Sequence, residues 1–152
     1  MKTNNYFWIL ILVLLAIISC EKDDFCVESI TPKLILRFYD FDDSTALKAT
    51  ERMFVWAVNK DSIYEEAALD SIYVPLNLSD ITTTYVLENN SILDTLELSY
   101  TPHDVFVSRS CGYITIFEDF EVKRVTNNWI KDIEIINTII EHDTTAHIHI
   151  LH

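Results

Sequence analysis

The sequence of 152 residues contains a single glycine, Gly112. Phosphate-binding loops, dinucleotide-binding fingerprints and the nucleophile elbow each need several glycines, because their backbones adopt positive φ angles or approach a ligand closely. Most nucleotide-dependent enzymes and the α/β-hydrolase class are therefore excluded. Tight turns in this chain must instead use Asn, Asp and Ser, which also tolerate turn conformations.

Apolar residues alternate with polar ones from Pro32 onward, and turn residues interrupt the alternation at short intervals, which predicts β-strands. Asn89-Asn90-Ser91 predicts a tight hairpin, and residues 141–144 predict another between the last two strands. Pro75 predicts an edge strand or a bulged one, since proline cannot donate a ladder hydrogen bond. The predicted strands cover residues 33–39, 52–59, 72–76, 82–88, 93–100, 105–107, 114–116, 129–140 and 145–151.

Strand follows strand without a βαβ rhythm, so the expected fold is all-β: a single antiparallel β-sandwich, Ig-like in broad architecture, over residues 30–152. Residues 52–59 are apolar on both faces and predict a central strand, with Phe54, Trp56 and Val58 on a face packed in the core. Ser62–Leu69 is the one stretch predicted to be helical, for a turn or two.

The N-terminus has the pattern of a lipoprotein signal peptide over residues 1–19. Lys2 precedes an uncharged run, Tyr6–Ile18, that is shorter than the roughly 20 residues needed to span a bilayer. The run ends in Ile17-Ile18-Ser19-Cys20, which resembles the bacterial lipobox and predicts lipidation of Cys20 after cleavage. The alternatives are an ordinary signal peptide with a chance cysteine, or an uncleaved anchor helix.

Residues 20–29 form a short charged leader behind the lipidated cysteine. Glu21-Lys22-Asp23-Asp24 resembles the surface-export signal of lipoproteins in the Bacteroidota phylum. We therefore expect a lipid-anchored protein of the outer membrane that faces the outer surface. The alternative is retention on the periplasmic leaflet, with these charges as a solvated spacer.

Two cysteines remain once Cys20 carries lipid. Cys26 and Cys111 would lie in an oxidising compartment, where disulfides persist, and only one intramolecular pairing is possible. Closing a loop of about 85 residues would stabilise the fold by roughly 4 to 5 kcal/mol in the chain-entropy model. Buried free thiols or a Cys/His metal pair are the alternatives. The five residues between Cys20 and Cys26 span at most about 17 Å, so a disulfide would hold the domain close to the membrane.

Four segments together resemble a family of small Bacteroidota lipoproteins known only as a domain of unknown function. The segments are TPKLILRFYDF, SIYVPL, VFVSRSCGYITIF and the closing HIHILH. The resemblance extends from about Cys20 to the end of the chain, and its sharpest element is Ser108–Tyr113. It implies the architecture and location given above, and no activity.

Polar residues at three places could carry chemistry. His147 and His149 lie two apart in a predicted strand and could bind zinc, although Ile148 and Ile150 on the opposite face favour a half-buried strand with its polar residues outward. Glu118, Asp119 and Glu121 could supply the paired acids of a glycosidase, or a solvated strand face. Residues 40–43 could bind calcium through Asp40, Asp42 and Asp43. They lack the EF-hand spacing, however, and this favours a solvated turn.

The formal net charge of −13 excludes nucleic acid as a partner, because an acidic surface repels phosphate backbones. We expect no cofactor and no catalysis. The predicted function is a lipid-anchored accessory, binding or envelope-structural module, with an envelope protein as its partner. The alternatives are a carbohydrate-processing hydrolase that uses paired carboxylates, and a metal-binding lipoprotein that uses the C-terminal histidines.

Overall fold

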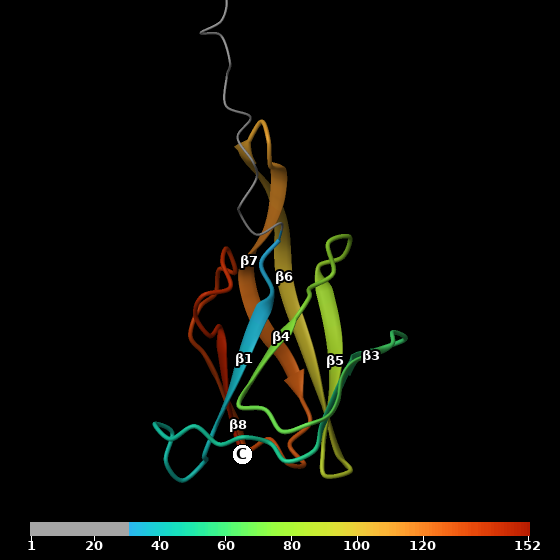
Figure 1. Cartoon of the computed structure of the whole chain (residues 1–152), viewed down its shortest axis with the longest axis vertical. Helices are drawn as coiled ribbons and strands as arrows, with labels where there is room; N and C mark the ends of the chain where they lie inside the picture. Colours follow the sequence, from blue (N-terminus) through green and yellow to red (C-terminus); the bar gives the residue numbers. More distant parts are fainter. Residues whose placement is uncertain (1–30) are drawn as a thin grey trace, which may run out of the picture.

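The structure is a computed structural model that describes residues 31–152. The described residues form nine strands in two sheets that pack as a sandwich (Figure 1). The first sheet has the order β4-β1-β9-β8 and contains β1 (Leu34–Tyr39), β4 (Ser71–Val74), β8 (Asp132–Ile135) and β9 (Ile148–Leu151). The second has the order β3-β2-β5-β6-β7 and contains β2 (Met53–Ala57), β3 (Ser62–Ala67), β5 (Thr82–Asn89), β6 (Ile92–Ser108) and β7 (Gly112–Val125). The all-β sandwich is confirmed.

The core lies between the two sheets and is built from alternate residues of each strand. On β1 the inward side chains are Leu34, Leu36 and Phe38, and on β6 they include Leu96 and Leu98, all of them buried. Such alternation is the signature of strands with one covered face. The remaining buried members of the cluster are Met53, Val55, Ile72, Val74, Leu76, Tyr85, Leu87, Tyr100, Phe117, Phe120, Trp129, Ile130, Ile140, Ile148 and Ile150.

The prediction that all strands pair antiparallel is wrong for β9. This strand pairs antiparallel with β8 but parallel with β1, in the register Leu36↔Ile148 and Phe38↔Ile150. Turn residues in the sequence specify the direction of strands that are neighbours along the chain. The pairing of β1 with β9 joins opposite ends of the described chain, so the packing of the whole sheet determines it.

The prediction of a helix at Ser62–Leu69 is also wrong, because Ser62–Ala67 forms β3. β3 pairs with β2 with register shifts, and Glu66 adopts a positive φ of 49°. Tyr64 packs against the core and Ser62 Oγ donates to the Val55 carbonyl. The glutamates, alanines and leucine of this stretch favour a helix, but intrinsic propensity is small beside tertiary packing, and these contacts override it.

The hairpin at Asn90-Ser91 is confirmed. Asn89 pairs with Ile92, and the two residues between them have φ angles of 51° and 68°, as a two-residue type I′ turn requires. The last predicted hairpin is wrong in its length, since β8 and β9 meet at Ile135↔Ile148 and leave residues 136–147 as a long connection. Ile140 in this connection forms a bridge to Phe117 of β7, which draws the chain across to the other sheet.

β4 ends at Val74, directly before Pro75, and lies at the edge of its sheet as predicted. The hydroxyl of Tyr64, from the opposite sheet, accepts a hydrogen bond from Tyr73 N (2.9 Å) and faces its carbonyl oxygen (3.3 Å). These contacts use backbone groups that an edge strand would otherwise leave open to another chain.

The strand at residues 52–59 is central, because β2 lies between β3 and β5. Its inward face was predicted wrongly. Met53 and Val55 point into the core and are fully buried, whereas Phe54 and Trp56 are half-buried on the outer face and Val58 is exposed. When a strand is apolar on both faces, its sequence does not show which face the second sheet covers.

Candidate functional site

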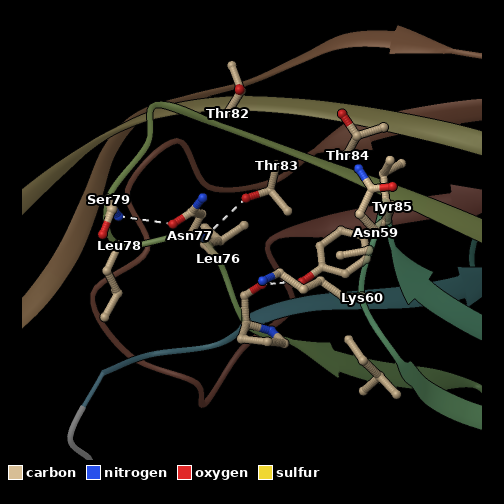
Figure 2. A pocket seen from close by; sticks show the side chains of 14 residues that line it. Asn59, Lys60, Leu76, Asn77, Leu78, Ser79, Thr82, Thr83, Thr84 and Tyr85 are labelled. Atoms are coloured by element: carbon tan, nitrogen blue, oxygen red, sulfur yellow. Dashed lines mark hydrogen bonds between the residues drawn. The ribbon is translucent and has the colours of Figure 1, made fainter.

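A groove of about 740 Å³ lies beside the start of β5 (Figure 2). Its walls are the turn between β2 and β3, the loop that follows β4, and the first residues of β5. The lining residues are Ala57, Val58, Asn59, Lys60, Ile63, Pro75, Leu76, Asn77, Leu78, Ser79, Thr82, Thr83, Thr84 and Tyr85. Its volume is in the range of ligand-binding clefts.

The groove opens where β2 separates from β5. The last register pair is Ala57↔Tyr85, and one more hydrogen bond joins Val58 N to the Thr84 carbonyl (3.0 Å). The chain then turns at Asn59, which adopts a φ of 63°. β5 continues past this point, so Thr82 and Thr83 have no β2 partner beside them.

The loop after β4 is held in place by the hydroxyls of two buried tyrosines and a partly exposed threonine. Asn77 N donates to Tyr100 Oη (2.8 Å) and to Thr83 Oγ1 (3.1 Å), and Tyr85 donates to the Pro75 carbonyl. Burial raises the pKa of both tyrosines, so their hydroxyls stay protonated at neutral pH. The wall of the groove is therefore formed before any ligand arrives.

The lining combines apolar surface with neutral hydrogen-bonding groups. Figure 2 shows the Thr83 hydroxyl and the Asn77 amide beside the apolar side chain of Leu76, while Thr82 and Thr84 project from the other side of β5. Lys60 is the one charged residue of the lining, in a chain whose net charge is −13. Such a surface can bind a ligand that presents apolar area and hydrogen-bonding groups together.

The candidate acids lie elsewhere. Glu118, Asp119 and Glu121 belong to β7, which β6 separates from β5 and the groove. Asp119 is exposed at a bulge with a φ of 51°, and Glu121 forms an ion pair with Lys123. The fold therefore does not bring these carboxylates to the groove.

The two candidate zinc ligands have different surroundings. His147 is fully buried, and its Nδ1 accepts a hydrogen bond from Ile35 N (3.1 Å). His149 is half-buried, with its ring 4.4 Å from that of Tyr39 and its Nδ1 3.8 Å from Glu134 Oε2. The expectation that both point outward is wrong for His147, since the polypeptide folds its imidazole back onto the backbone of β1. No group of three or more His, Cys, Asp or Glu side chains suited to a metal occurs within residues 31–152.

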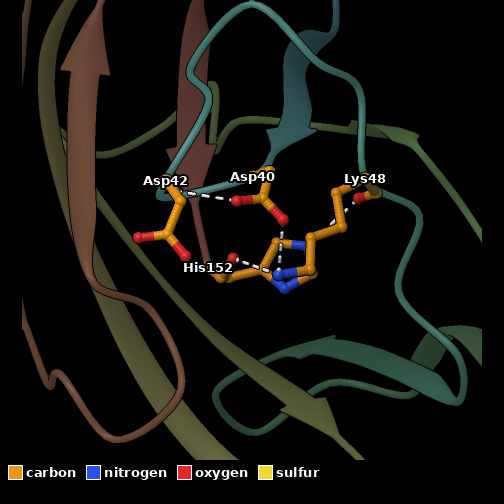
Figure 3. Close-up of polar contacts among 4 residues, drawn as sticks. All are labelled: Asp40, Asp42, Lys48 and His152. Atoms are coloured by element: carbon orange, nitrogen blue, oxygen red, sulfur yellow. Dashed lines mark hydrogen bonds and ion pairs between the residues drawn. The ribbon is translucent and has the colours of Figure 1, made fainter.

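The aspartates at 40–43 form a turn that is bonded internally (Figure 3). Asp40 accepts from Asp42 N (2.8 Å) and pairs with Lys48 (3.0 Å), and the hydrogen bond from Lys48 lowers the pKa of Asp40. Lys48 also donates to the His152 carbonyl (2.8 Å), and His152 Nε2 lies 3.0 Å from the Lys48 carbonyl. These contacts connect the turn to the end of β9, and the solvated-turn interpretation accounts for the aspartates.

Residues 52–152 match a family described as "Family of unknown function (DUF6452)". The chain belongs to the DUF6452 family. No curated protein and no solved structure matches the chain significantly.

The DUF6452 match includes every residue that lines the groove but begins after β1. β1 lies between β4 and β9, and Leu34, Leu36 and Phe38 are fully or almost fully buried in the core. The sandwich of this DUF6452 protein therefore includes residues that precede the matched range.

The remaining predicted sites involve the N-terminal cysteines. Cys20 and Cys26 lie outside the described residues. Cys111 lies in the turn between β6 and β7, where its backbone N donates to Ser108 Oγ (3.0 Å), and it is not a free thiol. The pairing of Cys26 with Cys111 stays a prediction. No helix among residues 31–152 is long and apolar enough to cross a membrane.

Asp94 is a buried carboxylate that was not among the residues predicted to matter. Its side chain is fully buried and accepts hydrogen bonds from Thr126 Oγ1 and from the backbone N of Asn128, Trp129 and Ile130, each at 2.8 Å. The carboxylate thereby holds the loop that carries the chain from β7 toward β8. Its position two residues before Leu96 placed it in the inward phase of β6, and this was the signal to notice.

Proposed function

We propose that this DUF6452 protein is a non-enzymatic binding module of the outer membrane, held by lipid on Cys20 and exposed at the outer surface. The support for the anchor is the charged start, the short uncharged run and the small residue before Cys20. The acidic residues directly behind Cys20 support export to the surface.

The proposal includes a disulfide between Cys26 and Cys111. Support comes from the position of Cys111 in an exposed turn and from its not being a free thiol. The disulfide would fix the leader to the turn between β6 and β7. The sandwich would then stay within a short distance of the lipid.

One observation carries the binding role: a preformed groove whose lining has hydroxyls, amides and apolar side chains but no carboxylate. A pocket without an acid–base pair fits binding better than hydrolysis. Apolar side chains beside neutral donors and acceptors suit a peptide segment. We therefore propose an envelope protein as the partner, with a segment of that protein in the groove.

The groove is tested with a photo-crosslinking residue in place of Leu78, in the intact acylated protein in its own membrane. Leu47, a similarly exposed leucine outside the groove lining, is the matched control position. We expect one discrete adduct from position 78 and none from position 47. The same adducts from both positions, or none from either, would contradict the binding role.

The anchor is tested separately. Mass spectrometry of the mature protein should find an acylated Cys20 as its first residue, and Cys20→Ser should release the chain from the membrane. Protease added to whole cells should digest the protein. Protection from the protease would place it on the periplasmic leaflet instead.

A further inference from the structure

β6 and β7 extend beyond the sandwich as a two-stranded ribbon, residues 101–118. The pairing of β5 with β6 ends at Thr82↔Ser99, and from Thr101 onward the register pairs of β6 are with β7 alone. Figure 1 shows the ribbon projecting past the other strands at one end of the molecule. Its tip is the turn between Ser108 and Gly112.

The tip exposes aromatic side chains to solvent. Phe106 is 55% exposed and Tyr113 is 68% exposed, the highest value among the exposed large apolar residues. The two residues are register partners, and their rings contact edge to face with centroids 5.4 Å apart. Their neighbours Val105 and Ile114 are also partly exposed and lie on the opposite face of the ribbon, so both faces of the tip present apolar surface.

The charge of the tip differs from that of the chain. Residues 105–117 contain one charged side chain, Arg109, and no acid, whereas the whole chain has a net charge of −13. Exposed Phe and Tyr beside a cation are typical of protein surfaces that enter the interfacial layer of a bilayer, where rings meet acyl chains and Arg meets lipid phosphate.

The chain between the proposed anchor and the first described residue is short. Cys20 is 11 residues before Thr31, the first described residue. Those 11 residues reach at most about 40 Å, and a Cys26–Cys111 disulfide would shorten the path from lipid to tip to about 20 Å. A tether of this length keeps the tip at a high effective concentration beside the bilayer.

We infer that the ribbon tip inserts Phe106 and Tyr113 into the interfacial layer of a phospholipid surface, with Arg109 at the phosphate groups. The inference rests on the proposed lipid anchor. It gives the sandwich a second membrane contact, so that the domain has a set orientation on the membrane.

The test places a tryptophan at the tip of the mature acylated protein, Phe106→Trp, in vesicles of phosphatidylcholine and phosphatidylglycerol with brominated acyl chains. Phe41→Trp is the matched control, since Phe41 is 52% exposed and lies in the loop after β1, at the other end of the molecule (Figure 1). Trp56 and Trp129 are common to both variants. We expect bromine to quench the added emission by roughly half at position 106 and to leave position 41 unchanged.

The outcomes separate the two proposals. If Cys20 is acylated and position 106 is quenched no more than position 41, the inserted tip is wrong and the anchor stands. If Cys20 carries no lipid, the proposed anchor is wrong, and quenching of the unacylated Phe106→Trp chain by added vesicles still decides the tip. A blue shift at position 106 that grows with protein concentration without vesicles would assign the tip to a second copy of the chain and overturn the inference.

Discussion

β6 and β7 run through two environments. Outside the ribbon, both strands belong to the second sheet and face the first sheet, and Leu96, Leu98 and Phe120 are fully buried. Within the ribbon, residues 101–118, the same strands expose Phe106 and Tyr113. Alternation of side chains continues through both parts. The difference is that the first sheet covers these strands outside the ribbon and not within it, and only a covered apolar face becomes core.

The two environments can be compared with the same substitution. Phe120→Ala should lower the free energy of unfolding by about 3 to 5 kcal/mol, because it leaves a cavity between the sheets. Phe106→Ala should cost less than about 1 kcal/mol, the worth of one exposed aromatic pair. Chemical denaturation measures both. Equal losses would show that the ribbon is part of the cooperative core.

Asp94 provides the next contrast, between a buried and an exposed carboxylate. Asp94→Ala should lower the free energy of unfolding by about 3 kcal/mol, because three backbone N–H groups and the Thr126 hydroxyl lose their acceptor. Asp61→Ala, at an exposed position, should change it by less than about 0.5 kcal/mol. A near-neutral Asp94→Ala would mean that water replaces the carboxylate.

The histidines of the sandwich make its stability depend on pH. Burial lowers the pKa of His147, His149 and His152 below the ordinary value of 6.5. Below pH 6.5 the unfolded chain therefore binds more protons than the folded one, so stability is complete above this pH and declines as the pH falls. Thermal unfolding across pH 5 to 8 measures the decline, and NMR titration of the His147 ring should give a value under 6.5. A melting temperature that rises on acidification from pH 6.5 would contradict the prediction.

The smallest effects belong to the turns at the two ends of β6. Ser91 has a φ of 68° in the lower turn and Gly112 a φ of 73° in the upper one. Ser91→Gly should raise the free energy of unfolding by about 0.5 to 1 kcal/mol, because glycine adopts this conformation without strain. Gly112→Ala should lower it by about 1 kcal/mol through strain alone, since no atom beyond the adjacent residues lies within 4 Å of the added Cβ. Effects of the opposite sign would show that contacts rather than φ dominate.

Local sequence determined the elements of this protein. Period-two alternation predicted most of the strands, though not β3, and Asn90-Ser91 and Pro75 predicted a tight hairpin and an edge, as the structure has them. These signals succeed because each depends on residues that are close along the chain. The scarcity of glycine excluded enzyme classes for the same local reason.

Tertiary structure alone decided which partners those elements meet. The parallel pairing of β1 with β9, the outward face of Trp56 and the burial of His147 depend on strands far apart in sequence. The groove arises where β2 leaves β5, and the ribbon where the first sheet ends while β6 and β7 continue. Alternation along a strand indicates that it has an apolar face, but only the packing of the two sheets determines whether that face lies in the core, in a groove or in solvent.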